Sequence, residues 1–203
     1  MKILHIKSSV FNGHGQSSQL ASEFVAQLRD QNPAAEVVER DLVAEAIPHL
    51  DGARAGAFFA KPEERTDEQK AVVAYSDGLI AELRSADVLV LGLPMYNFGV
   101  PSQLKAWFDH VARAGETFKY TDKGAVGLVT GKKAYVFATR GGVYGEQDFQ
   151  TQFVRQFLGF IGIAEVEFVY AEGLAMGEDS RNKGIAAAQS RARRLALESR
   201  LAA

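Results

Sequence analysis

Short apolar runs alternate with longer apolar patterns of helical period along the chain, and this pair recurs five times. Parallel neighbouring strands need a long crossover, usually a helix, so the alternation predicts a three-layer α/β fold around a five-stranded parallel sheet. The predicted strands span residues 2–7, 36–42, 87–94, 132–139 and 165–173. Because no repeat or linker divides the sequence, we expect residues 1–203 to form a single domain.

The predicted strands differ in polarity. Residues 87–94 (DVLVLGLP) are almost entirely apolar, which is typical of a central parallel strand buried on both faces. Residues 36–42 (EVVERDL) are more polar and are expected at an edge of the sheet. Two stretches, residues 43–65 and 114–130, show no clear period, so we expect both to be irregular excursions from the alternating pattern.

Helix signals fill the intervals between the strands. Apolar residues recur at helical spacing from Leu20 until Asn32-Pro33, which is a stop signal. Thr66 and Gln69 have the spacing of a capping box, in which each residue bonds the backbone of the other. Three further helices are expected, one opening at Pro101, one over residues 149–160 and one over residues 180–200.

Composition narrows the range of functions. Lys and Arg number 23 against 25 Asp and Glu, so the net charge of −2 offers no attraction to nucleic acid or an anionic membrane. The absence of cysteine excludes disulfides, thiolate nucleophiles and Cys-ligated metals, and the four histidines lack metal-ligand spacing. No signal-peptide or membrane-spanning run occurs in this sequence, so we expect a cytoplasmic protein.

Three loops are expected to converge on one ligand. In a doubly wound sheet of order 2-1-3-4-5, ligands bind beyond the carboxyl ends of the strands, where the strand order reverses. The first, third and fourth predicted strands lie side by side there, and they are followed by residues 8–18, 95–99 and 139–145. All three loops are rich in Gly, Ser, Thr or Asn, which suits close backbone approach and hydrogen bonding.

The first loop leads directly into a helix, and a helix N-terminus attracts phosphate through its free N–H groups and its dipole. The hydroxyls of Ser9 and Ser17 could add hydrogen bonds to such an anion. Alternatively, Ser17 and Ser18 cap the helix, a role that is compatible with phosphate binding.

Two resemblances to nucleotide-binding motifs are rejected. Gly13-x-Gly15-x-x-Ser18 lacks the third glycine of the dinucleotide fingerprint, and its loop is too long for the tight first turn. Gly131-Lys132-Lys133 lacks both the earlier glycine and the following Ser or Thr of a Walker A motif, so we interpret it as a turn.

The other two loops suit a flat ring. Met95, Tyr96 and Phe98 offer apolar contact, Asn97 can donate and accept, and the backbone of Gly141-Gly142 can approach a ligand edge. Alone, the second loop would be interpreted as an ordinary turn, and solvation is the commoner fate of Arg140. A phosphate-binding loop beside two ring-binding loops describes a mononucleotide with a large planar head, and FMN fits it better than a dinucleotide.

Seven segments, taken in order, resemble the FMN-dependent NADH:azoreductase family, whose flavodoxin-like members also reduce quinones. They are KSSVFNGHGQSSQL, PMYNFGVPSQLK, RAGETFKY, GLVTGKKA, TRGG, FLGFIGI and AEG, and they span essentially the whole chain. The resemblance implies that Ser9, Gly15, Gln16 and Ser17 hold the FMN phosphate. It places two further groups against the flavin ring: Met95, Tyr96, Asn97 and Phe98, and Thr139, Arg140, Gly141 and Gly142.

Two positions depart from the family pattern, since Gly15 and Thr139 stand where serine is common. The resemblance also implies a homodimer with its flavin sites at the subunit interface, and it places Tyr120 and Phe160 near the open face of the flavin. The stripe Phe149, Phe153, Phe157, Phe160 recurs at helical spacing. We expect at least half of these side chains to face the core and the rest to serve a dimer surface or substrate pocket.

The implied activity is hydride transfer from NADH or NADPH through bound FMN to quinones and azo compounds, by a ping-pong mechanism. The flavin performs the chemistry, so no catalytic acid or base is assigned, and no metal is expected. Arg54, Lys61 and Arg65 could bind the 2′-phosphate of NADPH, although solvation is their commoner fate. Two alternatives are a flavodoxin-type electron carrier without NAD(P)H turnover and a flavin-free, NAD-dependent dehydrogenase of Rossmann type.

Overall fold

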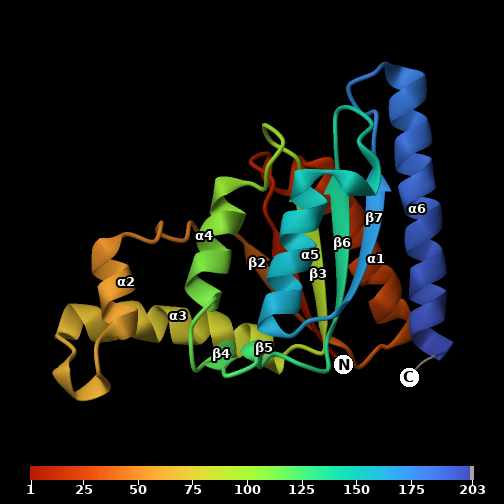
Figure 1. Cartoon of the computed structure of the whole chain (residues 1–203). Coiled ribbons are helices and arrows are strands. Elements are labelled where there is room, and N and C mark those ends of the chain that lie inside the picture. Colours follow the sequence, from red (N-terminus) through yellow and green to blue (C-terminus); the bar gives the residue numbers. More distant parts are fainter. Residues whose placement is uncertain (202–203) are drawn as a thin grey trace.

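A computed structural model describes the backbone of residues 1–201. A five-stranded sheet with every pair parallel forms its centre (Figure 1). In spatial order the strands are β2 (Glu36–Asp41), β1 (Lys2–Lys7), β3 (Val88–Pro94), β6 (Lys133–Thr139) and β7 (Glu165–Ala171). Counting only these strands along the chain gives the predicted order 2-1-3-4-5, with β2 at the predicted edge.

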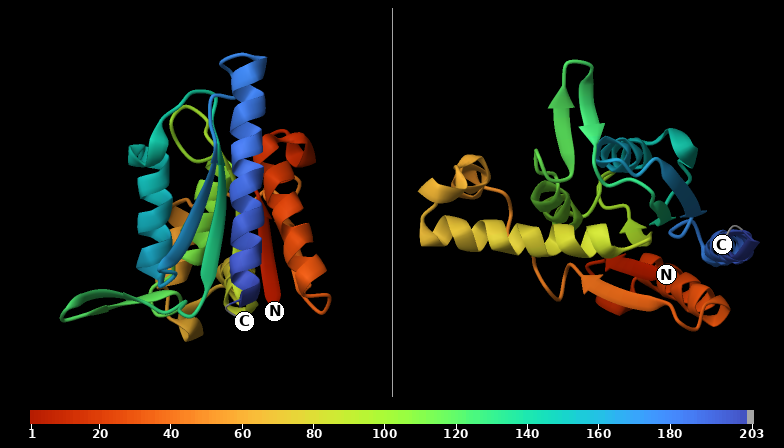
Figure 2. Two further views of the ribbon diagram at one scale, coloured as in Figure 1. Left: turned by 90° about the vertical axis from the view of Figure 1, so that its right-hand side faces the viewer. Right: turned by 90° about the horizontal axis from the view of Figure 1, so that it is seen from below.

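Helices cover both faces of the sheet (Figure 2). The α1 helix (Gln16–Gln31) and the α6 helix (Glu178–Leu201) bury one face, in a core that contains Phe24 and Tyr135. Three helices cover the other face, in a core centred on Trp107 and Phe108: α3 (Asp67–Ser85), α4 (Ser102–Val111) and α5 (Phe149–Ile161). Central strands therefore have apolar side chains on both faces, as their sequence predicts.

Local signals set the helix boundaries. The capping box of α3 is confirmed, because the N–H of Thr66 donates to Gln69 Oε1 at 3.0 Å and the N–H of Gln69 donates to Thr66 Oγ1 at 3.3 Å. At the end of α5, Gly162 adopts a left-handed conformation with φ of 111°, where glycine avoids the steric cost of a side chain. Both boundaries follow directly from residue type.

Residues 43–65 are not wholly irregular, so that prediction is wrong. They contain the helix α2 (Gly52–Phe59) and a short 3₁₀ helix, η2 (Pro62–Glu64). The side chain of Asp51 caps α2 by accepting the N–H of Arg54 at 2.8 Å. A two-turn helix that buries only Ala57 shows little apolar period, which explains why the pattern does not reveal it.

Residues 114–130 contain a hairpin of β4 (Phe118–Thr121) and β5 (Gly124–Gly127), which projects from the body of the protein (Figure 2). Four-residue strands are too short to display an alternating pattern, so the sequence analysis missed them. Two further boundaries differ from prediction, since β7 ends at Ala171 and α6 begins at Glu178.

The hairpin is held against the C-terminal end of α5. A Cβ atom on Gly127 would lie 2.2 Å from the backbone nitrogen of Gly162, so only glycine permits this approach. The N–H of Val129 donates to the carbonyl of Ile161 at 2.8 Å. Since α5 runs opposite to the strands, the hairpin lies at the amino-terminal edge of the sheet (Figure 1). Among the described residues, no helix is long and apolar enough to cross a membrane.

Candidate functional site

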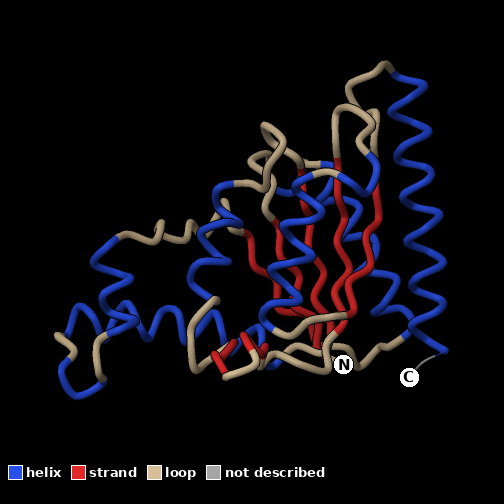
Figure 3. The backbone as a smooth tube through the Cα atoms, viewed as in Figure 1, coloured by secondary structure: helices blue, strands red, loops and turns tan. Residues whose placement is uncertain are grey.

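The loops after β1, β3 and β6 meet at the carboxyl edge of the sheet (Figure 3). They enclose a small cavity of about 170 Å³. Eight of the twelve predicted cofactor-binding residues line it: Ser9, Gly15, Gln16, Met95, Tyr96, Thr139, Arg140 and Gly141. The remaining four are Ser17, Asn97, Phe98 and Gly142, and each lies in the same three loops or in the first turn of α1. The predicted convergence of the three loops is therefore observed.

The N-terminus of α1 offers unused hydrogen-bonding groups. Gly15 is the N-cap residue of α1, and no side chain caps this end of the helix. The alternative that Ser17 and Ser18 cap the helix is therefore wrong. Both serine hydroxyls are buried and have no hydrogen-bond partner among the described residues. A buried hydroxyl without a partner is costly, so an anionic ligand at this helix end would relieve an existing deficit.

Gly92 in β3 brings this helix end close to the sheet. A Cβ atom on Gly92 would lie 3.2 Å from the carbonyl oxygen of Ser17, closer than an ordinary contact. The Oγ of Ser8 also donates to the carbonyl of Gly92 at 2.7 Å. The sequence analysis did not identify Gly92, although a glycine inside an otherwise apolar strand is a recognised signal of close backbone approach.

Ser9 connects the first loop to the second. Its Oγ lies 3.2 Å from the Tyr96 hydroxyl, which also accepts the N–H of Val10 at 3.2 Å. The N–H of Phe11 donates to Ser9 Oγ at 3.3 Å. Ser9 is 2% exposed and still lines the cavity, so its hydroxyl can serve both the loop and a ligand.

The second loop contains a strained turn. Asn97 and Phe98 have φ angles of 50° and 66°, which are uncommon for residues other than glycine. The backbones of Tyr96 and Gly99 exchange both N–H···O bonds around them, at 3.2 Å and 3.0 Å. The Phe98 ring is 67% exposed and packs edge-on against Tyr144. A left-handed conformation costs about 1–2 kcal/mol, and strain of this kind clusters at functional sites.

The third loop presents backbone donors. The carbonyls of Gly141 and Gly142 accept the N–H groups of Ala175 and Gly173, at 3.0 Å and 2.8 Å. By contrast, the N–H groups of both glycines have no partner in the described part of the chain. A Cβ on Gly142 would lie 3.1 Å from the Tyr144 ring, so a side chain would crowd the loop. These free donors are what the edge of a polar ring requires.

Arg140 is not solvated, and the expectation that solvation is its commoner fate is wrong here. Its side chain has no exposed surface and lies 2.6 Å from Asp148 Oδ2 and 3.0 Å from Glu172 Oε1. It also donates to Thr151 Oγ1 and to the carbonyl of Gly145, each at 2.6 Å. Burial of a charge requires such compensation. The guanidinium therefore holds the loop, while the backbone of Arg140 lines the cavity.

Two titratable groups report on this buried cluster. Burial acts to raise the pKa of Asp148, but hydrogen bonds from Thr151 and the charge of Arg140 outweigh it and hold that pKa below its ordinary value. Burial raises the pKa of Tyr170, whose ring lies under the Arg140 guanidinium. Glu172 completes the cluster by accepting the N–H groups of Tyr144 and Gly145 at 2.8 Å and 3.0 Å. The sequence analysis did not identify Glu172.

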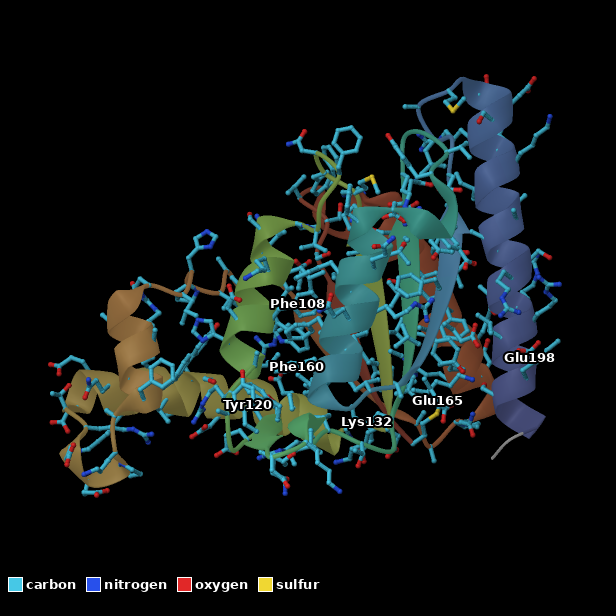
Figure 4. All side chains as sticks on the ribbon, in the orientation of Figure 1. Phe108, Tyr120, Lys132, Phe160, Glu165 and Glu198 are labelled. Atoms are coloured by element: carbon cyan, nitrogen blue, oxygen red, sulfur yellow. The ribbon has the colours of Figure 1, made fainter. Side chains whose placement is uncertain are left out.

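Tyr120 and Phe160 lie far from this cavity in the same chain. Figure 4 places both at the opposite edge of the sheet, beside the hairpin. Tyr120 is 74% exposed, and Phe118 packs against both its ring and that of Phe160. The structure thus brings these two residues together, but it does not bring them to the three loops of their own chain.

The phenylalanine stripe divides along α5. Phe157 and Phe160 pack against the core, whereas Phe149 and Phe153 are exposed, Phe149 to 83%. The Phe153 ring also lies 5.8 Å from the buried ring of Phe108, so at least half of the stripe contacts the core, as expected. The fully buried face of α5 nevertheless carries Val154, Leu158 and Ile161. The exposed pair lines an apolar cavity of about 460 Å³ beside Phe98.

Comparison with known proteins agrees with this fold. The family described as "Flavodoxin-like fold" matches residues 1–196, and the chain belongs to this family. A protein of Cellvibrio japonicus, named FMN-dependent NADH:quinone oxidoreductase, is 56% identical over 87% of this chain and 89% of its own length. A protein of the same name from Alcanivorax borkumensis is 55% identical over 94% of this chain and 97% of its own.

Solved structures give the same grouping. An azoreductase from Bacillus anthracis str. Sterne has a TM-score of 0.89 at 31% identity, and the match covers 97% of this chain and 98% of that one. An FMN-dependent NADH-azoreductase from Bacillus anthracis str. Ames Ancestor, solved in complex with FMN, has a TM-score of 0.84 at 26% identity. That match covers 96% of this chain and 99% of the other.

Proposed function

We propose that this protein is a cytoplasmic, single-domain FMN-dependent oxidoreductase that uses NADH to reduce quinones and azo compounds. The observation that carries the proposal is the convergence of three loops on one cavity, with two buried and unpaired hydroxyls at the adjoining helix N-terminus. Relatives at 55–56% identity are named FMN-dependent NADH:quinone oxidoreductase, and a structural neighbour was solved with FMN.

The residues present fit the phosphate of FMN. Ser17 supplies a buried hydroxyl, and the first N–H groups of α1 precede the first intrahelical bond, which runs from Gln19 to Gly15 at 3.0 Å. Ser9 lines the cavity nearby. Glycine at position 15 lacks the hydroxyl of the usual serine but keeps the backbone donor, so we expect phosphate binding to be retained.

The second and third loops fit the ring. Met95, Tyr96 and Thr139 line the cavity, and the free N–H groups of Gly141 and Gly142 are placed to donate to the polar edge of a flavin. When bound, FMN supplies hydride transfer from NADH and then to a quinone or azo compound, in two alternating half-reactions of ping-pong type. The chain contributes orientation, and Arg140 with Glu172 keeps the third loop in one conformation.

We further propose that the protein is a homodimer in which the partner's hairpin completes each site. Tyr120 and Phe160 lie at the wrong edge of their own sheet, so they can reach a flavin only in another subunit. The exposed rings of Phe98, Phe149 and Phe153 line an apolar cavity beside the second loop, which suits contact with a second copy.

NADH is the donor that the charges favour. Arg54 pairs with Asp51, Lys61 lies 3.1 Å from Glu64, and Arg65 donates to the carbonyl of Ala60 at 3.2 Å. These three side chains were the candidate ligands of a 2′-phosphate, and each is already engaged within its own segment. The relatives at 55–56% identity are named for NADH, and we propose NADH as the donor.

The visible spectrum of the purified protein tests the proposal. We expect flavin absorbance that bleaches on anaerobic addition of NADH and returns when a quinone is added. Rapid steady-state oxidation of NADH in the presence of a quinone would separate an enzyme from an electron carrier, which would show almost none. A protein that takes up no FMN at all would contradict the proposal and favour a flavin-free dehydrogenase.

A further inference from the structure

Gln150, the second residue of α5, joins that helix to both ends of the second loop. Its side chain is 1% exposed, and Nε2 donates to the carbonyls of Pro94 and Gly99, each at 2.9 Å. An amide nitrogen carries two N–H groups, so it can make both bonds at once. The four residues 95–98 between these carbonyls include the strained pair Asn97 and Phe98.

The orientation of the amide is fixed by its surroundings. Reversing it would place an oxygen against two carbonyl oxygens, three acceptors without a proton between them. Its Oε1 is buried and has no partner among the described residues. The buried Oε1 therefore stays unpaired, which costs stability, while Nε2 holds the two ends of the second loop together. A cost of this kind indicates that a fixed conformation of the second loop is required.

The same helical turn also holds the third loop. Asp148 caps α5 by accepting the N–H of Thr151 at 3.0 Å, and both side chains contact the guanidinium of Arg140. The first turn of α5 is therefore the common support of the two loops that we assign to the flavin ring. Gln150 lines the 460 Å³ cavity and not the 170 Å³ cavity, so it acts on a ligand in the smaller cavity indirectly, and the second loop that it bonds is the direct connection.

We propose that Gln150 is a positioning residue that holds the second loop in the conformation that receives the flavin ring. The effect on FMN binding rests on the proposed function, whereas the structural part, the effect on the second loop, concerns the FMN-free chain alone. Replacing Gln150 with Leu removes both donors, so the carbonyl of Pro94 loses its bond to the side chain and the carbonyl of Gly99 keeps only the N–H of Tyr96. The strained turn is then free to adopt other conformations.

Amide hydrogen exchange of the FMN-free protein tests the structural part. In Gln150→Leu, the peptide that covers residues 95–100 should exchange faster than in the unaltered protein, whereas the strands should keep their protection. The matched control is Gln156→Leu, an exposed glutamine on the same helix. Unchanged exchange of residues 95–100 would overturn the proposal, whether or not the protein is a flavoenzyme.

The FMN-loaded protein tests the consequence. For Gln150→Leu we expect an FMN dissociation constant raised about tenfold, the effect of about 1.4 kcal/mol. At saturating FMN, the visible circular dichroism of the bound flavin should change and kcat should fall. A purely structural role would lower thermal stability but leave the flavin dichroism and kcat at saturating FMN unchanged, and that result would refute the positioning role.

The two failures are distinguishable. If the unaltered protein binds no FMN, the proposed function fails, while the exchange experiment still decides whether Gln150 closes the loop. If the unaltered protein binds FMN and oxidises NADH, equal flavin dichroism in Gln150→Leu and Gln156→Leu overturns only the role of Gln150. Gln150→Glu provides a second variant of similar size, since a carboxyl group has at most one proton and cannot donate to both carbonyls at once.

Discussion

The guanidinium of Arg140 lies 2.6 Å from Oδ2 of Asp148, and both side chains are almost fully covered by the protein. Asp148 begins the helix that follows the third loop, and Arg140 begins that loop, so this pair closes the loop at its two ends. A charged pair in this position is sensitive to the loss of either partner, because the remaining charge stays buried.

Arg140→Met should therefore destabilise the protein by about 3–5 kcal/mol in unfolding free energy, because Asp148 and Glu172 would lose their common partner. Urea unfolding checks this, with Arg193→Met on the exposed surface of α6 as the control. Adding Glu172→Gln to Arg140→Met should restore part of the loss by removing one uncompensated charge. Equal stability of the Arg140 and Arg193 variants would contradict the role of this cluster.

Ser17→Ala should weaken FMN binding about tenfold, which is the loss of one hydrogen bond to a charged group. The buried and unpaired Ser17 hydroxyl is the basis for this expectation. Titration of the FMN-free protein, followed by flavin fluorescence, measures the change. Ser22→Ala, five residues further along α1, is the control and should bind FMN normally. An unchanged affinity in Ser17→Ala would rule out its contact with phosphate.

Phe98→Gly should raise the thermal midpoint while lowering turnover. Glycine adopts a φ of 66° without the cost of about 1–2 kcal/mol that a side chain incurs, and little buried surface is lost because the ring is mostly exposed. The loss of the ring should reduce kcat/KM for a quinone. Thermal unfolding and steady-state kinetics on the same samples test both parts, and a lowered midpoint would contradict the expectation that relief of strain outweighs the lost Phe98–Tyr144 contact.

Tyr120→Ala should change quinone turnover while leaving the FMN dissociation constant unaltered, because Tyr120 is distant from the phosphate and ring loops of its own chain. Sedimentation or light scattering should give twice the chain mass of 22.1 kDa. Mixing Tyr120→Ala with a chain defective in FMN binding offers a sharper test. In a mixed dimer with shared sites, the partner's intact hairpin would complete the flavin site of the Tyr120→Ala chain, so part of the turnover should return. A monomer would contradict the shared-site arrangement.

His5 should make stability depend on pH. Burial, together with the charge of Lys7, lowers the pKa of His5 from 6.5 to about 4, and Glu39 opposes the change only in part. Between these two values the unfolded chain binds a proton that the folded chain does not, so stability is complete above pH 6.5 and declines as the pH falls toward 4.

The expected decline from His5 is about 3 kcal/mol in unfolding free energy. Urea unfolding of the unaltered protein and of His5→Leu at several pH values isolates this contribution, because other acidic groups titrate in both proteins. The stability of the unaltered protein relative to His5→Leu should fall as the pH is lowered toward 4. Parallel curves across this range would show that His5 is not held neutral.

Much of the fold was predictable because it depends on patterns that each strand and helix carries alone. The apolar run at β3 and the polar run at β2 predicted a centre and an edge, and the structure confirms both. The helix α2 and the hairpin were missed because a short element buries too few side chains to produce a period.

The candidate site was likewise predictable only in part. Strand order brought the three loops together, so residues such as Tyr96 and Gly141 were found from topology and residue type. Glu172 and Gln150 were missed because their roles depend on contacts across 32 and 51 residues of sequence, which no local pattern records. The burial of Arg140 was unexpected for the same reason, since its carboxylate partners come from other elements.

The contact between Gly127 and Gly162 has a consequence for redesign. Any side chain at either position would push the hairpin away from α5 and carry Tyr120 with it, at the far tip of the same hairpin. If Tyr120 contacts the acceptor in the partner's site, as proposed above, a methyl group at either glycine would alter acceptor preference from a position outside the flavin cavity. Directed-evolution libraries restricted to pocket-lining residues would not sample these two glycine positions.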